Sequence, residues 1–209
     1  MKRTILRSTG TAAAALALSV SLAACGADDE NTDATANGDD TSQNTDPGAD
    51  GAGAQTFGEG CALIPADGAG SFNGMATEPV ATAASANPLL TTLVTAVGEA
   101  GLVDTLNSAE ALTVFAPTDD AFAKIPEADL NAVLADKELL TTILTHHVVA
   151  GQLGPDEVAG RHETLAGDRI RVNGSGEAFT VADEDAAVLC GNIPTANATV
   201  YVIDTVLMP

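Results

Sequence analysis

Two adjacent histidines, His146 and His147, carry the most versatile side chains in this sequence, because imidazole can bind metals and transfer protons near neutral pH. Neighbouring residues face opposite sides of a strand and lie about 100° apart on a helix, so the two rings are poorly placed to bind one metal ion together. The remaining histidine, His162, has no neighbours with metal-ligand spacing. We therefore expect no metal site and no cofactor.

Other patterns that could support catalysis are weak. No Gly-X-Ser-X-Gly elbow is present for a nucleophilic serine. The acidic run at residues 183–185 could hold Ca²⁺ loosely, but it lacks the glycine and distal glutamate of an EF-hand loop, so we interpret it as a solvated turn. Asn173 and Asn197 each begin a glycosylation triplet, which we interpret as incidental. We predict that the protein is not an enzyme.

The charge of the chain excludes several classes of partner. There are 29 acidic and eight basic residues, a net charge of −21. Three of the eight bases, Lys2, Arg3 and Arg7, lie at the N-terminus, which leaves five for the rest of the chain. Such a chain lacks the basic face that holds nucleic acid through its phosphates or draws a protein to anionic lipid. We expect no nucleic-acid partner.

The N-terminus has the pattern of an export signal. Basic residues are followed by an apolar stretch from residue 11 to 24, which is too short for a membrane-spanning helix. The sequence Leu22-Ala23-Ala24-Cys25 resembles the bacterial lipobox, whose cysteine is acylated after cleavage. The resemblance implies a signal peptide at residues 1–24 and a lipid anchor on Cys25, which would hold the exported protein on the extracellular side of the cell membrane.

The residues after Cys25 predict a tether and one folded domain. Residues 26–60 contain nine acids and no base among mainly small and polar residues, and so cannot bury enough apolar surface to offset chain entropy. We predict that residues 25–60 are a lipidated, disordered linker and that residues 61–209 form a single domain. Cys61 and Cys190 remain as a pair that an oxidising compartment would join.

Within the predicted domain, helix patterns come first and strand patterns last. Asn87 and Pro88 predict a helix start with Asn87 as N-cap, and Asn173-Gly174 predicts a hairpin turn. Further helices are predicted at residues 79–86, 102–106, 118–122, 127–134 and 137–144. Strands are predicted at residues 111–115, 148–149, 169–172, 178–182, 187–190 and 199–208. This order indicates the α+β class.

Two long segments resemble the signatures of the fasciclin-like adhesion domain. The first is Thr-Val-Phe-Ala-Pro-Thr-Asp-Asp-Ala-Phe at residues 113–122 and the second is Val-Tyr-Val-Ile-Asp-Thr-Val-Leu-Met-Pro at residues 200–209. Residues 145–151 resemble the segment between them. With its flanking cysteines, the chain is most similar to the group of mycobacterial-type secreted immunogenic proteins and cell-surface lipoproteins, which implies an actinobacterial, Gram-positive-type envelope. The resemblance also implies an α+β fold, a β-wedge of about seven strands with several helices packed on it.

The resemblance assigns structural roles to most motif residues. His147 takes the place of the family's histidine, which we expect to make a buried hydrogen bond at a helix-to-strand junction. His146 replaces a tyrosine proposed to help animal members bind integrins, so that His146 and Asp120 are candidate interaction residues and we expect His146→Ala to be tolerated. The residues expected to be structural are Thr113, Phe115, Pro117, Thr118, Asp119, Phe122, His147, Tyr201, Asp204 and Pro209.

Together these features predict a surface-anchored module that binds without catalysing a reaction. The resemblance and the lipobox imply adhesion to an extracellular or cell-surface protein or matrix partner by a monomeric domain, with the N-terminal lipid as its only membrane contact. The alternative is an envelope lipoprotein that carries a lipid or small ligand in an apolar cleft between the helices and the wedge.

Overall fold

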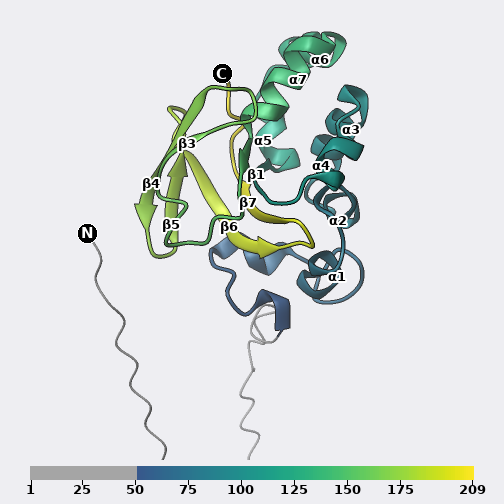
Figure 1. Ribbon diagram of the computed structural model, residues 1–209. Coiled ribbons are helices and arrows are strands. Elements are labelled where there is room, and N and C mark those ends of the chain that lie inside the picture. The colour runs from purple at the N-terminus through teal and green to yellow at the C-terminus, as the bar shows by residue number, and fades with distance from the viewer. Residues whose placement is uncertain (1–50) are drawn as a thin grey trace, which may run out of the picture. The chain divides into compact units, whose positions relative to one another are not determined.

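The computed structural model describes residues 51–209, in which β1 lies between α4 and α5 and the other six strands follow the last helix (Figure 1). The predicted signal peptide, Cys25 and most of the predicted linker lie outside the described residues. The helices are η1 (Gly51–Gly53), η2 (Glu59–Leu63), α1 (Phe72–Ala76), α2 (Val80–Ala86), α3 (Thr91–Ala100), α4 (Val103–Ser108), α5 (Asp119–Ala123), α6 (Glu127–Ala135) and α7 (Lys137–His146). In residues 51–209, no helix has both the length and the apolar character that crossing a membrane requires.

The strands form one seven-stranded sheet in the order β2-β1-β7-β6-β5-β4-β3. They are β1 (Leu112–Pro117), β2 (Val148–Ala150), β3 (Gly160–Glu163), β4 (Arg169–Ser175), β5 (Ala178–Val181), β6 (Ala186–Pro194) and β7 (Ala198–Ile203). Neighbouring strands are antiparallel except β1 and β7, which are parallel. The edge strands β2 and β3 approach each other through a bridge between Val149 and Thr164, so the sheet is nearly closed. The predicted α+β fold is confirmed.

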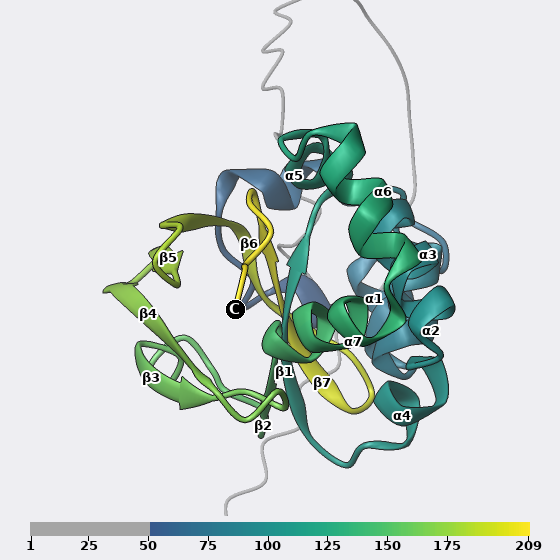
Figure 2. The ribbon, with the colours of Figure 1, turned by 90° about the horizontal axis from the view of Figure 1, so that it is seen from above.

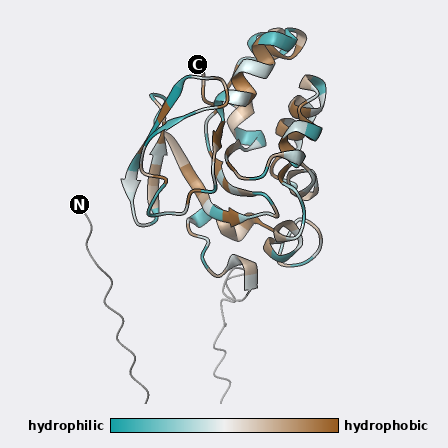
Figure 3. Cartoon of the chain, in the orientation of Figure 1, coloured by the Kyte–Doolittle hydropathy of each residue, from teal (hydrophilic) through white to brown (hydrophobic). Residues whose placement is uncertain are grey.

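The curled sheet separates two cores. One lies between the helices and the β1–β7–β6 part of the sheet, and the other is enclosed by the sheet around Phe57, Phe115, Phe179 and Tyr201. Viewed from above, the helices cover one side, and β3, β4 and β5 stand across the enclosed core from β1 (Figure 2). Hydrophobic colour gathers on β1, β7 and the facing helix surfaces, whereas β3 and β4 are largely hydrophilic (Figure 3).

The start of α3 differs from the prediction. The helix begins at Thr91, and Asn87 is a buried residue at the end of α2 whose side chain accepts a hydrogen bond from the backbone N–H of Leu89. The capping role belongs to Asp119, whose carboxylate accepts hydrogen bonds from the N–H of Thr92 at 2.7 Å and from the Thr91 hydroxyl. A carboxylate distant in sequence therefore caps the exposed amide groups at the start of this helix.

Two predictions about the second half of the sheet are wrong. Asn173 and Gly174 lie within β4, and the hairpin turns instead at residues 176–177, where Gly176 adopts a positive φ of 67°. The last strand ends at Ile203, so the final residues leave the sheet. Strand β3 was not predicted, because its sequence Gly-Arg-His-Glu is short and polar.

The folded unit begins earlier than the predicted boundary at Cys61. Residues 51–60 include η1 and the start of η2, and Phe57 is buried and pairs with Gly191 of β6. The Phe57 ring occupies the space that a side chain at residue 191 would need, because a Cβ atom there would lie 2.3 Å from the ring. The linker prediction is therefore wrong for residues 51–60. The Cys61–Cys190 disulfide is present, with an S–S distance of 2.00 Å.

Candidate functional site

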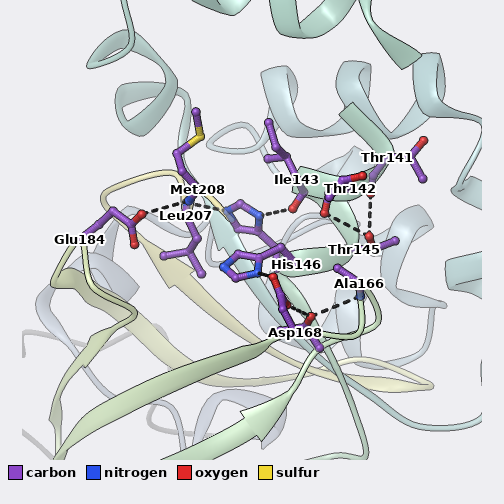
Figure 4. A network of polar contacts seen from close by, with 12 residues as sticks. Thr141, Thr142, Ile143, Thr145, His146, Ala166, Asp168, Glu184, Leu207 and Met208 are labelled. Carbon is purple, nitrogen blue, oxygen red and sulfur yellow. Dashed lines mark hydrogen bonds and ion pairs between the residues drawn. The ribbon is translucent and has the colours of Figure 1, made fainter. Parts of the chain in front are cut away.

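The two adjacent histidines lie where α7 ends and β2 begins (Figure 4). Asp136 caps the start of α7, since its carboxylate accepts hydrogen bonds from the N–H groups of Glu138 and Leu139. The helix then carries His146 in its last position and His147 at its C-cap. Both rings are buried, with 5% and 2% of the residue surface exposed.

His147 joins the end of α7 to the C-terminal segment. Its Nδ1 donates to the carbonyl of Ile143 at 2.8 Å, and its Nε2 accepts from the backbone N–H of Leu207 at 2.9 Å. Burial lowers the pKa of His147 to about 4, with His146 adding to the lowering and the bond to Ile143 opposing it. The ring is therefore neutral near pH 7, and it makes the buried hydrogen bonds that the family resemblance implied.

His146 makes a different contact from the one expected of an exposed interaction residue. Its Nδ1 donates to the carboxylate of Asp168 at 2.7 Å, and the hydroxyl of Thr164 donates to the same carboxylate. Burial would raise the pKa of Asp168, but these two hydrogen bonds lower it below its usual value. His146 thus connects α7 to the β3–β4 turn, and the expectation that it is dispensable conflicts with this position.

The motif residues inside the curled sheet form a second polar connection. The Thr113 hydroxyl donates to the carbonyl of Gly151 at 2.6 Å and accepts from the N–H of Leu153 at 2.9 Å. The Tyr201 hydroxyl donates to the carbonyl of Leu153 at 2.9 Å, and its ring packs against Phe115. Burial, followed by the charge of Glu157, raises the pKa of Tyr201 above its usual value. These groups hold the segment after β2 against the core.

The remaining motif residues lie around α5. Thr118 caps this helix by accepting a hydrogen bond from the N–H of Ala121, and Phe122 is buried. Asp204 accepts from the N–H of Ala187 and pairs with Lys124 at 3.0 Å. Burial would raise the pKa of Asp204, but the bonds from Lys124, Ala187 and Thr205 lower it.

The last three motif residues and the acidic run differ in their exposure to solvent. Pro117 is buried at the end of β1, whereas Asp120 and Pro209 are exposed. The acidic run at residues 183–185 is an exposed turn between β5 and β6. In residues 51–209, no group of three or more His, Cys, Asp or Glu side chains is arranged to hold a metal ion.

The two glycosylation triplets differ in their accessibility. Asn197 is buried, and its amide donates to the carbonyls of Leu106 and Ala109 while accepting from the N–H of Val80. This side chain is therefore unavailable for glycosylation in the folded protein. Asn173 is exposed on β4.

Two hollows lie on either side of the histidine junction. An apolar cavity of about 60 Å³ lies between α2, α3, α4 and α7 and the strands β1 and β2, with the exposed side chains of Val103 and Leu165 at its border. A polar hollow of about 440 Å³ lies beyond His146, where Arg161, Arg169 and Arg171 line it. The strand predicted at residues 169–172 contains Arg169 and Arg171, whereas Arg161 lies in β3, a strand whose short polar sequence does not predict it.

Comparison with known proteins gives consistent matches. The model of the fasciclin domain family matches residues 88–209. The chain is 48% identical over 177 residues to the cell surface glycolipoprotein MPB83 of Mycobacterium bovis, which covers 81% of this chain and 77% of that protein. It is 49% identical over 160 residues to the immunogenic protein MPB70 of the same species, covering 73% of this chain and 81% of that protein.

A solved structure is also similar. A FAS1 domain pair from the insect cell adhesion molecule fasciclin I aligns with a TM-score of 0.47 and 21% sequence identity. The alignment covers 57% of this chain and 45% of the insect chain, so this protein spans less than half of that molecule.

Proposed function

This chain belongs to the fasciclin domain family, and from that premise we infer that it is a lipid-anchored protein of the cell surface that binds an extracellular or cell-surface partner without catalysis. Its relative MPB83, at 48% identity, is named a cell surface glycolipoprotein, which supports the location. The lipobox at residues 22–25 supports a lipid anchor on Cys25, and the acidic residues that follow would hold the folded unit away from the membrane.

The observation that carries the non-catalytic part of the proposal is the use of the histidines. All three histidines of the chain lie in the described part. His146 bonds Asp168, His147 bonds Ile143 and Leu207, and His162 bonds the carbonyl of Val158 at 2.8 Å. The imidazole groups, which are the side chains best suited to proton transfer, therefore connect parts of the scaffold. We accordingly propose that the protein acts by binding a partner through its exposed surface.

The alternative function, lipid or small-ligand carriage, draws little support from the cavity. Ligand pockets usually enclose roughly 300–1,000 Å³. The apolar cavity between the helices and the sheet has about 60 Å³, which is too small for a lipid chain. Binding through an exposed face is therefore the function that we propose.

The proposal is tested by attachment of living cells. Cells that produce the full chain, cells that lack it, and cells that produce Cys25→Ala are compared on surfaces coated with several matrix and cell-surface proteins. We expect the full chain to increase attachment, and Cys25→Ala to move the protein into the medium and abolish the gain. Equal attachment by all three strains on every surface would contradict the adhesive function, and retention of Cys25→Ala on the membrane would contradict the lipid anchor.

A further inference from the structure

The outer face of the β3–β4 ribbon carries an unusual group of positive charges. Only five of the eight bases lie beyond residue 7, and three of these are arginines, Arg161, Arg169 and Arg171. Arg161 of β3 lies directly opposite Arg171 of β4 in the antiparallel pair, and Arg169 follows two residues from Arg171 on the same face. The alternate residues Ile170 and Val172 are buried, so the three guanidinium groups are on the solvent side.

None of these arginines forms an ion pair within residues 51–209. Like charges directly opposite each other in a sheet are destabilising, and this chain has 29 acids that could have relieved the repulsion. Within residues 51–209 the ion pairs are Lys124–Asp204 and His146–Asp168, and neither involves an arginine. Glu163 of β3 lies opposite Arg169 in the same pair of strands, whereas the facing residues Arg161 and Arg171 have no ion pair in the described part of the chain.

The same arginines line a hollow of ligand size. Its volume is about 440 Å³, and its wall also includes His146, Asp168, Asp183 and Glu184. The carboxylate of Asp168 is occupied by His146 and Thr164, and that of Glu184 accepts the backbone N–H of Met208 at 3.1 Å. Asp183 is exposed. The hollow therefore brings guanidinium donors and carboxylate acceptors together in one wall.

We propose that this arginine hollow, defined by Arg161, Arg169 and Arg171, binds a sugar phosphomonoester carried by the extracellular partner. A phosphomonoester has a charge of roughly −1.5 to −2 and three acceptor oxygens, so it can neutralise two guanidinium groups at once. A carboxylate has a single charge, so it neutralises two facing arginines less completely. Hydroxyl groups of the attached sugar donate to the carboxylates that line the same hollow, and those carboxylates repel a longer polyanion.

The proposal rests on the proposed function, because it names the chemistry that the surface module recognises. Two sources supply this chemistry, a soluble or glycan-linked sugar phosphate and a membrane lipid with a phosphomonoester headgroup. Both present the same dianionic group to Arg161 and Arg171.

Binding in solution tests the proposal independently of cell attachment. Glucose 6-phosphate, glucose and glucuronate are titrated calorimetrically against the full chain and against the double variant Arg161→Gln/Arg171→Gln. We expect glucose 6-phosphate to bind the unaltered protein, with the double variant at least about tenfold weaker because two charge-assisted contacts are lost. A second arm compares vesicles containing phosphatidic acid with vesicles of phosphatidylcholine alone, and selective binding to the former identifies the lipid headgroup as a source.

The matched control is Lys124→Gln/Lys137→Gln, which removes the same charge from other parts of the fold. This control should bind glucose 6-phosphate as the unaltered chain does, and the arginine variant should melt at the same or a higher temperature without ligand, because it removes opposed charges. Equal binding of glucuronate, equal loss in the lysine control, or no binding of glucose 6-phosphate would overturn the proposal. Phosphate binding without cell attachment would refute the adhesive function alone, and attachment that survives the arginine changes would refute the hollow alone.

Discussion

The junction between α7 and β2 and the ribbon of β3 and β4 are neighbours that differ in how their polar and charged groups are paired. At the junction, both nitrogens of the buried His147 ring have partners, and in residues 51–209 no buried side-chain nitrogen or oxygen lacks one. On the ribbon, Arg161 and Arg171 face each other without an ion pair to the described residues. The first arrangement stabilises the fold, whereas the second has a cost that a bound anion would offset. The contrast separates residues that build the protein from residues that are free to recognise a partner.

The largest loss of stability is expected in the enclosed core, whose buried residues, like those of the junction, build the fold. Phe115 is fully buried against Tyr201, so Phe115→Ala should leave a cavity and lower the free energy of unfolding by about 3–5 kcal/mol. Chemical denaturation monitored by circular dichroism measures this change. A loss below about 1 kcal/mol would show that the core collapses around the missing ring. The substitution would then cost no more stability than a substitution on the exposed β3–β4 ribbon.

The next effect is a pH dependence that belongs to the junction. The pKa of His147 is lowered from 6.5 to about 4 in the folded protein, so between these values the unfolded chain binds a proton that the folded one does not. Stability should therefore be complete above pH 6.5 and fall by about 3 kcal/mol as the pH drops to 4. Asp119, Asp168 and Asp204 have lowered pKa values, and their contribution is lost only at lower pH, below about 3.8.

Denaturation at pH 7.0 and pH 4.5 measures this dependence. His147→Gln should be less stable than the unaltered chain at pH 7.0 and should lose most of the change between the two pH values, whereas the matched control His162→Gln should retain it. An unchanged pH dependence in His147→Gln would assign the effect to other groups and separate it from the junction.

The smallest effect should appear where the two regions meet. His146→Ala removes the buried ring that bonds Asp168, and we expect a loss of about 1–2 kcal/mol, because the partner carboxylate is partly exposed and solvent screens the pair. Arg171→Ala on the neighbouring strand should change the free energy of unfolding by about 0.5 kcal/mol or less. Thermal melts of the two variants compare them directly, and equal values would mean that the His146–Asp168 contact adds nothing to the fold.

Much of the fold could be predicted because its signals are local. The apolar face of α7 begins directly after Asp136, whose side chain caps it, and Thr118 caps α5 by accepting a hydrogen bond from the N–H of Ala121, three residues later. The buried hydrogen bonds of His147 were expected only through the family resemblance. In each of these cases the residue lies within one helical turn of the group that it binds, or it belongs to a long motif that identifies its role.

The parts that escaped prediction depend on contacts between distant residues. The carboxylate that caps α3 comes from Asp119, 27 residues after Thr92. The burial of His146 depends on Asp168, 22 residues later, which is positioned by the short polar strand β3. Phe57 lies in a glycine-rich acidic stretch, and its packing against Gly191 is invisible until β6 is in place. The local sequence around a residue does not indicate which distant residue it will contact.

The covalent link between Cys61 and Cys190 has a mechanical consequence. Tension that reaches Cys61 from the N-terminal side can pass directly into β6, a central strand of the sheet, because the disulfide spans 129 positions of the sequence. The helices between Cys61 and β1 lie within the loop that the disulfide closes, so this tension does not pass through them. Force applied from the N-terminal side would therefore load the sheet and leave the helices α1 to α4 unstretched.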